Sequence, residues 1–547
     1  MTVPVASLGD KPAVSVAEVV GRVLAAHGVG QVFGVVGSGN FHVTNALVAG
    51  GATFVATAHE AGAATMADAY ARTSGAVGVV SVHQGPGVTN AVTGIAEAAK
   101  SHTPLLVLAP EATAERSNFF IDLRAVANAV GARFQRVRAE RAAEDVTSAY
   151  RAAAQGNCVV LGLPLDVQAL SARFSVPELP EPLAEPVPAV AELVAAVRAA
   201  QRPVFIGGRG ARCAREPLVR LADRCGALLA VSAAAKGLFA GDPWNLDVAG
   251  GFATPLAAEL IGAADLVVAW GSTLNMWTTR HQRLIGPHAT VVQVDRDPTA
   301  LGVNRPLDVG VVGDVAAVAS TVDDALDPWR GNGYRSDGVR ARIASEGRWR
   351  DVSYVDDSTA GRIDPRTVSV ALDDLLPAER TLAVDSGNFM GYPSMFLSVP
   401  DVAGFCFTQG FQSVGLGLAS ALGAAVARPD RLTVAALGDG GFLMSAAELV
   451  TAVRLGLPLL IVVYNDAAYG AEVHHFGHSL ETVTFPDTDL AAIARGYGCD
   501  AVTVRAVDDL EPVVSWLAGS RDRPMLVDAK VTAERGSWWL EEAFRGH

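Results

Sequence analysis

The chain has 547 residues, of which 50% are hydrophobic and 18% are charged, and its 55 glycines and 28 prolines follow no period. At roughly 150 residues per domain, this length predicts three or four domains, and the composition excludes disordered and collagen-like proteins. The 57 acidic residues outnumber the 43 Lys and Arg residues, for a net charge of −14, and no basic cluster is present. Nucleic acids and anionic membranes bind to basic surfaces, so we expect neither as a partner.

The cysteines and the apolar runs of the sequence indicate the cellular compartment of the protein. The five cysteines are odd in number and contain no CxxC pair, which argues against a disulfide framework and against a zinc site. The segment from Met1 to Val14 lacks a basic stretch followed by an apolar run, and the longest apolar stretches are far too short to span a membrane. We therefore expect a cytoplasmic protein.

Short β-branched runs alternate with Ala-rich helical patterns in the first part of the chain, which is typical of a parallel α/β sheet. The expected strands there are Gln31–Val36, Thr53–Thr57, Val77–Val82 and Leu105–Leu108. Five prolines between Pro177 and Pro188 then predict an extended linker, because proline sustains neither a helix nor a central strand. The first domain is therefore expected at residues 1–175.

The same alternation returns twice after the proline-rich linker. The central region has expected strands at Pro203–Ile206, Leu266–Trp270 and Thr290–Val294. A polar connector, partly helical around Val339–Arg350, separates it from a third region with expected strands at Thr381–Val384, Leu432–Leu437, Leu459–Tyr464 and Pro524–Val527. We expect a central domain at residues 188–327 and a third domain at residues 362–547. The predicted fold class is α/β, with three doubly wound parallel-sheet domains in series.

One stretch of the third region has the residues of a diphosphate site. An expected strand ends in Gly438-Asp439-Gly440-Gly441, a helix follows, and the next expected strand ends in Asn465-Asp466. Ligands bind at the carboxyl ends of parallel strands, so we expect Asp439 and Asn465 at the same ligand-binding edge of the sheet. Their oxygens, beside glycine amides at a helix start, suit Mg²⁺ carrying a diphosphate. The alternative is that the first piece is a plain turn and the second a plain strand end.

Gly438-Asp439-Gly440 and Asn465 resemble the thiamine diphosphate signature of the pyruvate oxidase and acetohydroxyacid synthase superfamily. The resemblance implies that Asp439, Asn465 and the carbonyl of Ala467 hold Mg²⁺ against the cofactor diphosphate. It also implies three α/β domains that are pyrimidine-binding, central and diphosphate-binding. The implied cofactor-binding positions of the third domain are Asp385, Gly387, Asn388, Gln412, Val414, Gly438, Asp439, Gly440, Gly441, Asn465, Ala467, Tyr469 and Gly470.

The N-terminal region is similar to the pyrimidine-binding domain of the same family. His59 to Arg72 resembles its cofactor helix, and Gly85 to Asn90, which includes Pro86, resembles the loop that follows. The resemblance gives Glu60 the role of the activating glutamate, which bonds to the aminopyrimidine ring. The alternative for Glu60 is a favourable interaction with the helix dipole. In the third domain, Val414 and the Gln412 carbonyl match the segment that keeps the cofactor bent.

The family chemistry implies that a carbanion, and then an enamine, forms from a 2-oxo acid or a related donor. We expect a ligating enzyme, similar to acetolactate synthase, that joins this donor to an acceptor carbonyl. The alternative is a 2-oxo acid decarboxylase that does not ligate, so the class is transferase or lyase. Residues at the expected cofactor mouth that match catalytic positions, or could contact the substrate, are Ser38, His83, Gln84 and Glu472. Ser38 has the alternative role of capping the following helix.

Two departures limit the resemblance to acetolactate synthases. Ile121 replaces their active-site Gln, and Ala132 to Phe134 replaces a turn that contains Thr and Lys, which favours a specialised carboligase or decarboxylase. In the central region Gly208-Arg209-Gly210 opens a dinucleotide fingerprint, but Cys213 stands where its third glycine belongs. An NAD or FAD oxidoreductase and a non-catalytic cofactor-binding protein are more distant alternatives, and FAD is left open without being predicted. The family also implies a homodimer or homotetramer with sites at subunit interfaces.

Overall fold

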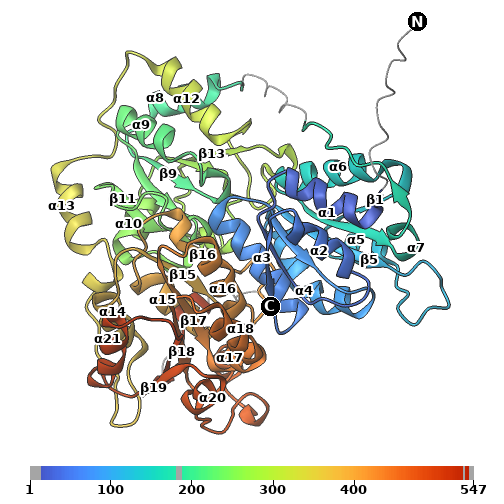
Figure 1. Cartoon of the computed structure of the whole chain (residues 1–547). Helices are drawn as coiled ribbons and strands as arrows, with labels where there is room; N and C mark the ends of the chain where they lie inside the picture. The colour runs from blue at the N-terminus through green and yellow to red at the C-terminus, as the bar shows by residue number, and fades with distance from the viewer. Residues whose placement is uncertain (1–13, 180–187, 534–535, 541–547) are drawn as a thin grey trace, which may run out of the picture.

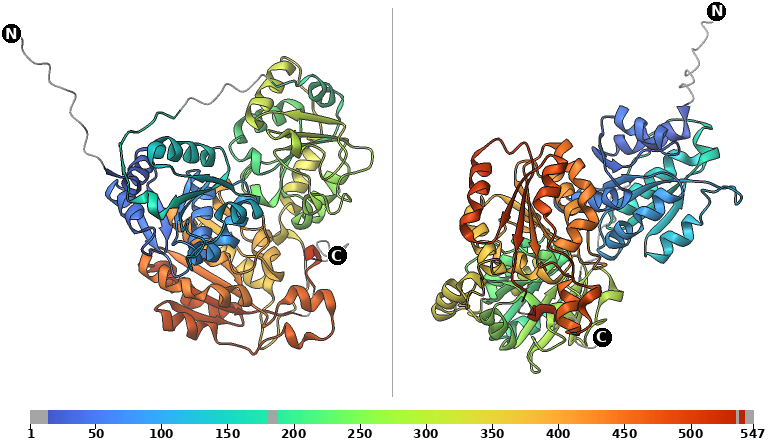
Figure 2. Two further views of the ribbon diagram at one scale, coloured as in Figure 1. Left: turned by 90° about the vertical axis from the view of Figure 1, so that its right-hand side faces the viewer. Right: turned by 90° about the horizontal axis from the view of Figure 1, so that it is seen from below.

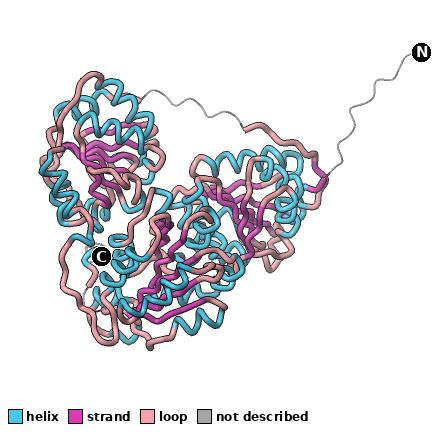
Figure 3. The backbone as a smooth tube through the Cα atoms, turned by 60° about the vertical axis from the view of Figure 1, so that its left-hand side comes forward, coloured by secondary structure: helices cyan, strands magenta, loops and turns pink. Residues whose placement is uncertain are grey.

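The computed structural model describes residues 14–179, 188–533 and 536–540. It contains three six-stranded parallel sheets, one in each of three lobes (Figures 1 and 2). Helices flank each group of strands (Figure 3). The predicted three α/β domains in series are therefore confirmed. Residues 1–13 and most of the proline-rich linker lie outside the described residues, so the predictions made there, and the exact domain boundaries, stay predictions.

The first sheet lies within the expected first domain. Its strands are β2 (Gln31–Gly34), β3 (Thr53–Ala56), β4 (Gly78–Ser81), β5 (Leu105–Glu111), β6 (Arg133–Arg136) and β7 (Cys158–Pro164), in the order β3-β2-β4-β5-β7-β6. An antiparallel pair, β1 (Val14–Ser15) and β8 (Ser171–Ala172), joins the two ends of the region. The helices are α1 (Val16–Ala26), α2 (Phe41–Ala49), α3 (Glu60–Ser74), α4 (Pro86–Lys100), α5 (Leu123–Ala129), η1 (Ala139–Arg141), α6 (Ala142–Ala154) and α7 (Leu165–Gln168).

The central sheet has a different strand order. Its strands are β9 (Pro203–Gly207), β10 (Leu228–Val231), β11 (Asn245–Val248), β12 (Leu266–Trp270), β13 (Thr290–Asp295) and β14 (Val309–Val312), in the order β11-β10-β9-β12-β13-β14. The helices are α8 (Ala191–Ala199), η2 (Arg209–Ala211), α9 (Arg215–Cys225), η3 (Ala233–Ala235), η4 (Gly250–Phe252), α10 (Pro255–Gly262), α11 (Met276–Thr279), η5 (Pro298–Ala300) and α12 (Val315–Leu326). This order reverses direction between β9 and β12, and such a reversal opens a crevice at the carboxyl ends of the two strands.

The connector to the third domain contains α13 (Asp337–Glu346) and η6 (Trp349–Asp351), as the partly helical prediction indicates. The strands of the third sheet are β15 (Arg380–Val384), β16 (Phe405–Phe407), β17 (Leu432–Gly438), β18 (Leu459–Asn465), β19 (Asp500–Val504) and β20 (Met525–Lys530), in the order β16-β15-β17-β18-β20-β19. The helices are α14 (Pro365–Leu375), η7 (Asn388–Met390), α15 (Gly391–Phe396), η8 (Val402–Gly404), α16 (Gly417–Ala427), α17 (Asp439–Ser445), η9 (Ala446–Glu448), α18 (Leu449–Leu455), α19 (Gly470–Phe476), η10 (Leu480–Thr482), α20 (Leu490–Tyr497), η11 (Val507–Leu510) and α21 (Glu511–Ala518).

Apolar strands that are covered on both faces hold the sheets together. Every residue of β5, β7, β18 and β20 is buried. Strands that are mostly apolar and wholly buried, such as β7 and β18, are typical of parallel sheets with helices on both faces. Among the described residues, no helix is both long enough and apolar enough to cross a membrane.

The first and third domains share one hydrophobic core. Side chains of α3, such as Ala63 and Met66, belong to the same buried cluster as Leu418 and Leu422 of α16. The two helices lie side by side near the centre of the molecule (Figure 1). Their backbones approach closely at Gly423, where an added Cβ atom would collide with the carbonyl oxygen of Met66. The small residue in α16 therefore sets the distance between the two domains.

This close approach predicts the effect of one added methyl group. Gly423→Ala should lower the stability of the fold by about 1–3 kcal/mol, because the backbone of α3 has to move. The control is Gly496→Ala in α20, where an added Cβ atom meets nothing within 4 Å. That change should be neutral or stabilising, since alanine favours a helix over glycine. Thermal unfolding of both variants checks the prediction, and equal midpoints would contradict it.

Candidate functional site

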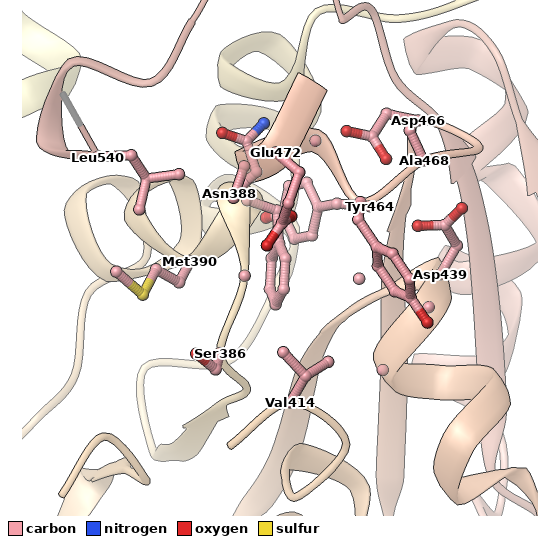
Figure 4. Close-up of a pocket in the computed structure, with 18 of the residues that line it drawn as sticks. Ser386, Asn388, Met390, Val414, Asp439, Tyr464, Asp466, Ala468, Glu472 and Leu540 are labelled. Carbon is pink, nitrogen blue, oxygen red and sulfur yellow. The ribbon is translucent and has the colours of Figure 1, made fainter. Parts of the chain in front are cut away.

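A cavity of about 420 Å³ opens at the carboxyl ends of the third sheet (Figure 4). This is the mouth that the sequence analysis predicts for the diphosphate site. The predicted residues that line the cavity are Gly387, Asn388, Gln412, Val414, Gly438, Asp439, Gly440, Gly441, Tyr469, Gly470 and Glu472. Three others from the same domain, Asp385, Asn465 and Ala467, do not line it.

Two carboxylates face each other at one end of the cavity. Asp439 begins α17, directly after the last residue of β17, and Asp466 follows the last residue of β18 (Figure 4). Burial raises the pKa of Asp439, and burial together with the neighbouring Asp439 raises the pKa of Asp466. A divalent cation between them would relieve this repulsion. The described residues contain no group of three or more His, Cys, Asp or Glu side chains placed to hold a metal, so the carboxylate pair stands alone here.

Asn465 points into the protein instead of into the cavity. It is the last residue of β18, one position later than the expected strand end, and its side chain is 1% exposed. Its Nδ2 donates to Asp528 Oδ1 at 2.8 Å, and its Oδ1 accepts from the Ala467 amide at 3.2 Å. Because side chains alternate along a strand, Asn465 and Asp466 face different ways.

The carbonyl of Ala467 also has a partner inside the protein. Ala467 has a positive φ of 58°, and its oxygen accepts the amide N–H of Phe485 at 2.8 Å. The next residue, Ala468, lines the cavity together with Asp466. The hydrogen bonds of Asn465 and Ala467 therefore hold the turn in place, whereas Asp466 and Ala468 are its residues that line the cavity. Strand alternation is the signal that would have identified these two residues from the sequence.

Asp385 acts on the backbone beside the cavity. Its buried carboxylate accepts the amide N–H groups of Ser386 at 2.8 Å, Gly415 at 3.0 Å and Leu416 at 3.1 Å. Burial raises the pKa of Asp385 to about 6, although these hydrogen bonds oppose the rise. A Cβ atom on Gly441 would collide with this carboxylate, so the glycine permits the contact. Asp385 thus joins the loop after β15 to the loop that carries Val414.

The loop with Gln412 and Val414 is held from the first domain. Gln412 has a positive φ of 60°, an uncommon conformation for a residue other than glycine. The carboxylate of Glu97 in α4 accepts the amides of Gly410 at 2.9 Å and Phe411 at 2.6 Å. Val414, further along the same loop, lines the cavity and is 36% exposed. The predicted pair therefore lies at the cavity, on a loop whose position depends on another domain.

Glu60 and Asn90 lie together in the first domain. Glu60 is the first residue of α3, and Asn90 in α4 donates from Nδ2 to Glu60 Oε2 at 3.0 Å. Its place in the first turn also suits the helix dipole, so both interpretations of Glu60 fit its position. Pro86 is the first residue of α4 and is exposed.

Ser38, His83 and Gln84 lie close together in the first domain, because Gly37 and Gly39 on either side of the exposed Ser38 lie against His83 and Gln84. The Gly39 amide donates to His83 Nδ1 at 3.4 Å, and a Cβ atom on Gly39 would collide with Gln84 Oε1. That Gln84 oxygen is buried and has no hydrogen-bond partner among the described residues. Asn40 is the N-cap of α2, so the capping alternative for Ser38 is wrong. Neither this cluster nor Glu60 lines the cavity of the third domain in the same chain.

Glu448 is a site residue that the sequence analysis does not identify. Its buried carboxylate accepts the amides of Ala58 at 3.2 Å and His59 at 3.1 Å, directly before Glu60. Thr451 Oγ1 donates to it at 2.7 Å, and Gly62 leaves room for it. A lone acidic residue in an apolar helical stretch is the signal in the sequence, but its partners lie almost 400 positions away.

Sequence models of known families match three parts of the chain. They are described as the N-terminal TPP binding domain, the central domain and the C-terminal TPP binding domain of thiamine pyrophosphate enzymes, and they match residues 14–129, 190–322 and 385–529. A Pseudomonas aeruginosa protein named "Probable 2-ketoarginine decarboxylase AruI" is 30% identical over 518 residues, 90% of this chain and 89% of that protein. The chain belongs to the thiamine pyrophosphate enzyme family. Thiamine pyrophosphate is the same compound as thiamine diphosphate, so the predicted family and organic cofactor are confirmed.

Other members of the thiamine pyrophosphate enzyme family are similar over almost the whole chain. The sulfoacetaldehyde acetyltransferase of Castellaniella defragrans is 29% identical over 533 residues, 90% of this chain and 88% of that protein. The acetolactate synthase large subunit of Haemophilus influenzae is 27% identical over 550 residues, which cover 94% of each chain. Asp439 and Asp466 lie within the part that matches the C-terminal TPP binding domain, as do most of the residues that line their cavity.

The contacts of Glu448 predict how the start of α3 is held. Glu448→Ala should lower the stability by about 2–4 kcal/mol, because two partly buried amides lose their acceptor. Amide hydrogen exchange at Ala58 and His59 should become faster, and thermal unfolding should begin at a lower temperature. Glu216→Ala is the control, since that side chain is 86% exposed. If both amides keep their protection in the Glu448 variant, this account of α3 is wrong.

Proposed function

We propose that this enzyme uses thiamine diphosphate and Mg²⁺ to join a 2-oxo acid, or a related donor, to an acceptor carbonyl. The observation that carries the proposal is the pair of buried carboxylates, Asp439 and Asp466, at the diphosphate end of the cavity. Bound thiamine diphosphate supplies a nucleophilic carbon that adds to a carbonyl group and accepts the negative charge left by decarboxylation. The chain supplies the metal ligands, the proton transfers and the choice of substrates.

For the metal, we propose Asp439, Asp466 and the carbonyl of Ala468 in place of the predicted set with Asn465 and Ala467. Mg²⁺ prefers six oxygen ligands and commonly keeps phosphate oxygens among them. Two carboxylates and one carbonyl leave room for a diphosphate and water. Gly438, Gly440 and Gly441 fit this arrangement, since they expose backbone at the cavity wall. Mg²⁺ thus stays a proposal, supported by the donor set.

Glu60 is proposed to exchange a proton with the pyrimidine ring of the cofactor. Its carboxyl group would bond to a ring nitrogen, and the 3.0 Å hydrogen bond from Asn90 would orient it. The anchoring of α3 by Glu448 keeps this carboxyl group in place. Ser38, His83, Gln84 and Glu472 are proposed to contact the substrates. The unpartnered Gln84 oxygen supports this role, because a buried polar atom without a partner is unfavourable.

A decarboxylase that does not ligate is the second candidate. It is supported by the name of the Pseudomonas relative and by Glu472, which lines the cavity and can donate a proton. The names of the other two relatives support transfer to an acceptor. Measuring released carbon dioxide and ligated product separately distinguishes the candidates. We also propose the cytoplasm as the compartment, because all five cysteines are free thiols.

We further propose a homodimer or homotetramer in which a second copy completes each site. Glu60 and the Ser38 cluster do not line the cavity of their own chain, although the proposed reaction requires them there. Large apolar side chains stay exposed beside both halves of the site. They are Phe41 (51%), Phe119 (41%), Phe411 (46%), Leu443 (45%) and Met444 (60%). Such surfaces are typical of interfaces between subunits.

The proposed metal ligands predict a difference between two neighbouring positions. With wild-type protein, thiamine diphosphate plus Mg²⁺ should raise the thermal midpoint, because a ligand that binds only the folded state stabilises it. Asp466→Ala should remove most of this increase, and Asp466→Asn should keep much of it, since an amide oxygen also binds Mg²⁺. Asn465→Ala is the comparison: it should lower the midpoint without cofactor, by removing the bond to Asp528, and still respond to the cofactor. A cofactor response lost only in the Asn465 variant would restore the original metal set.

Mixing two inactive variants tests the reaction and the shared site together. Glu60→Gln should bind thiamine diphosphate but lose most carbon dioxide release from 2-oxo acids, and Asp466→Ala should lose cofactor binding. After unfolding and refolding together, half of the dimers carry one intact site, so about a quarter of the wild-type activity should return. Each variant refolded alone is the control. No recovery in a confirmed mixed dimer would place both halves of the site in one chain.

A further inference from the structure

A second cavity, of about 360 Å³, lies where the three domains meet. Its floor is the crevice between β9 and β12 of the central sheet, at the point where the strand order reverses. The central domain contributes Arg209, Ser272 and Asn275 to the wall. The first domain adds Lys100 and His102.

The cavity wall is cationic in a protein of net charge −14. No Asp or Glu is among the residues that line it, whereas Lys100, His102 and Arg209 are. Among the described residues, none forms a hydrogen bond or ion pair with the Arg209 guanidinium, and the Lys100 ammonium lies over the Phe411 ring at 5.5 Å. Asp297 lies near enough to His102 to sense its charge, but it does not line the cavity. The wall therefore offers positive charge without counter-ions of its own.

Arg209 is the most deeply placed of these groups. Burial, together with the charges of Arg72 and Arg212, lowers the pKa of Arg209 to about 10. The carboxylates of Asp68 and Glu97 offset this only in part, because Arg72 already pairs with both at 2.8 Å. Arg209 and Arg72 thus share two acids in a desolvated region, and Arg212 adds a further positive charge beside Arg209. A bound anion would supply the missing charge.

The second cavity adjoins the reaction cavity along a shared wall. Trp277, Met390, Gln409 and Gln412 line both spaces. The two glutamine amides at this junction carry no charge, so they do not oppose the passage of an anion. A substrate that crosses this shared wall would extend from the proposed cofactor site to the cationic wall.

The glycine turn at the crevice is not arranged to hold the diphosphate of a dinucleotide. The amides of Gly208 and Gly210 donate to the carbonyls of Trp270 at 2.8 Å and Gly271 at 3.0 Å, so both are already used. The turn leads into η2, and the next α-helix begins only at Arg215. Dinucleotide sites instead place free amides and a helix start at the diphosphate.

We propose that this second cavity binds a distal anionic group of the substrate, such as a carboxylate, sulfonate or phosphate. This inference deepens the proposed function and rests on it: one end of the substrate carries the reacting carbonyl, and the other end carries the anion. Arg209 is the specificity-determining residue, with Lys100 and His102 beside it. Substrates whose distal end carries a negative charge are therefore preferred over substrates of the same length whose distal end is uncharged.

The kinetic test compares 2-oxoglutarate with 2-oxohexanoate as donors, and succinic semialdehyde with pentanal as acceptors. For whichever pair the enzyme uses, Arg209→Gln should lower kcat/KM for the member with a charged distal end by roughly tenfold or more. The member with an uncharged distal end should stay within about twofold. Lys100→Gln, at an exposed side chain, should act in the same direction with a smaller effect. Arg220→Gln is the matched control, because that arginine pairs with Glu216 on the surface of α9. If the wild-type enzyme prefers 2-oxohexanoate and pentanal, whose distal ends are uncharged, the proposal is wrong.

A binding experiment without turnover separates this inference from the proposed function. Isothermal titration calorimetry of sulfate and of glutarate, with thiamine diphosphate and Mg²⁺ present, should show binding to wild type that weakens at least tenfold in Arg209→Gln. Equal binding to both proteins would contradict the inference, even if carbon dioxide release from 2-oxo acids is normal. Binding that depends on Arg209 without any such release would instead contradict the proposed function. FAD or ADP bound in place of these anions, and dependent on Arg209, would identify a separate nucleotide and overturn the substrate assignment.

Discussion

The buried charge network of Arg72 fixes how the first and third domains meet. Arg72 in α3 pairs with Asp68 and Glu97 at 2.8 Å and donates to the carbonyl of Phe407 at 2.9 Å. Burial would raise the pKa of Glu97, but Arg72 and the amides of Phe411 and Gly410 hold it below its ordinary value. Removing one partner of such a network costs about 3–5 kcal/mol, because the other charge stays buried without compensation. The loop beside the proposed cofactor site therefore cannot move independently of the first domain.

Helix α3 transmits this constraint along its whole length. Its first turn is held by Glu448, its middle packs at Gly423, and its last turn carries Arg72. All three contacts reach the third domain or its loops. Glu60 is the first residue of the same helix, so its position is set by packing far from the carboxyl group itself. Close packing transmits such shifts, since interiors have few voids to absorb them. The helix is therefore both a domain joint and the support of the proposed proton-transfer residue.

Local patterns in the sequence predict the sheets and Asp439, one of the two proposed metal ligands. Contacts between segments that are distant in the sequence could not be predicted. β18 and β20 are recognisable because each begins with an apolar run, Leu459–Val463 in β18 and Met525–Val527 in β20. Asp439 follows a strand and precedes a helix, so its place at the mouth is a local property. Asp466 is missed because the family resemblance gives the metal position to Asn465, whereas alternation along β18 turns these two neighbouring side chains to different sides. Glu448 is missed because no periodicity connects it with His59. The first and third sheets even share one strand order without a recognisable sequence repeat.

The two adjoining cavities have opposite charge at their far ends. Asp439 and Asp466 are the acidic end, and Arg209 with Lys100 is the basic end. A free carboxylate is repelled from the acidic pair unless a cation lies between, whereas a metal-bound diphosphate is drawn to it. The basic end attracts anions and repels the metal. Because both ends are partly desolvated, these preferences are stronger than they would be in water. In the proposed arrangement this electrostatic field favours the cofactor diphosphate at one end and the substrate anion at the other, with the neutral glutamines Gln409 and Gln412 between them.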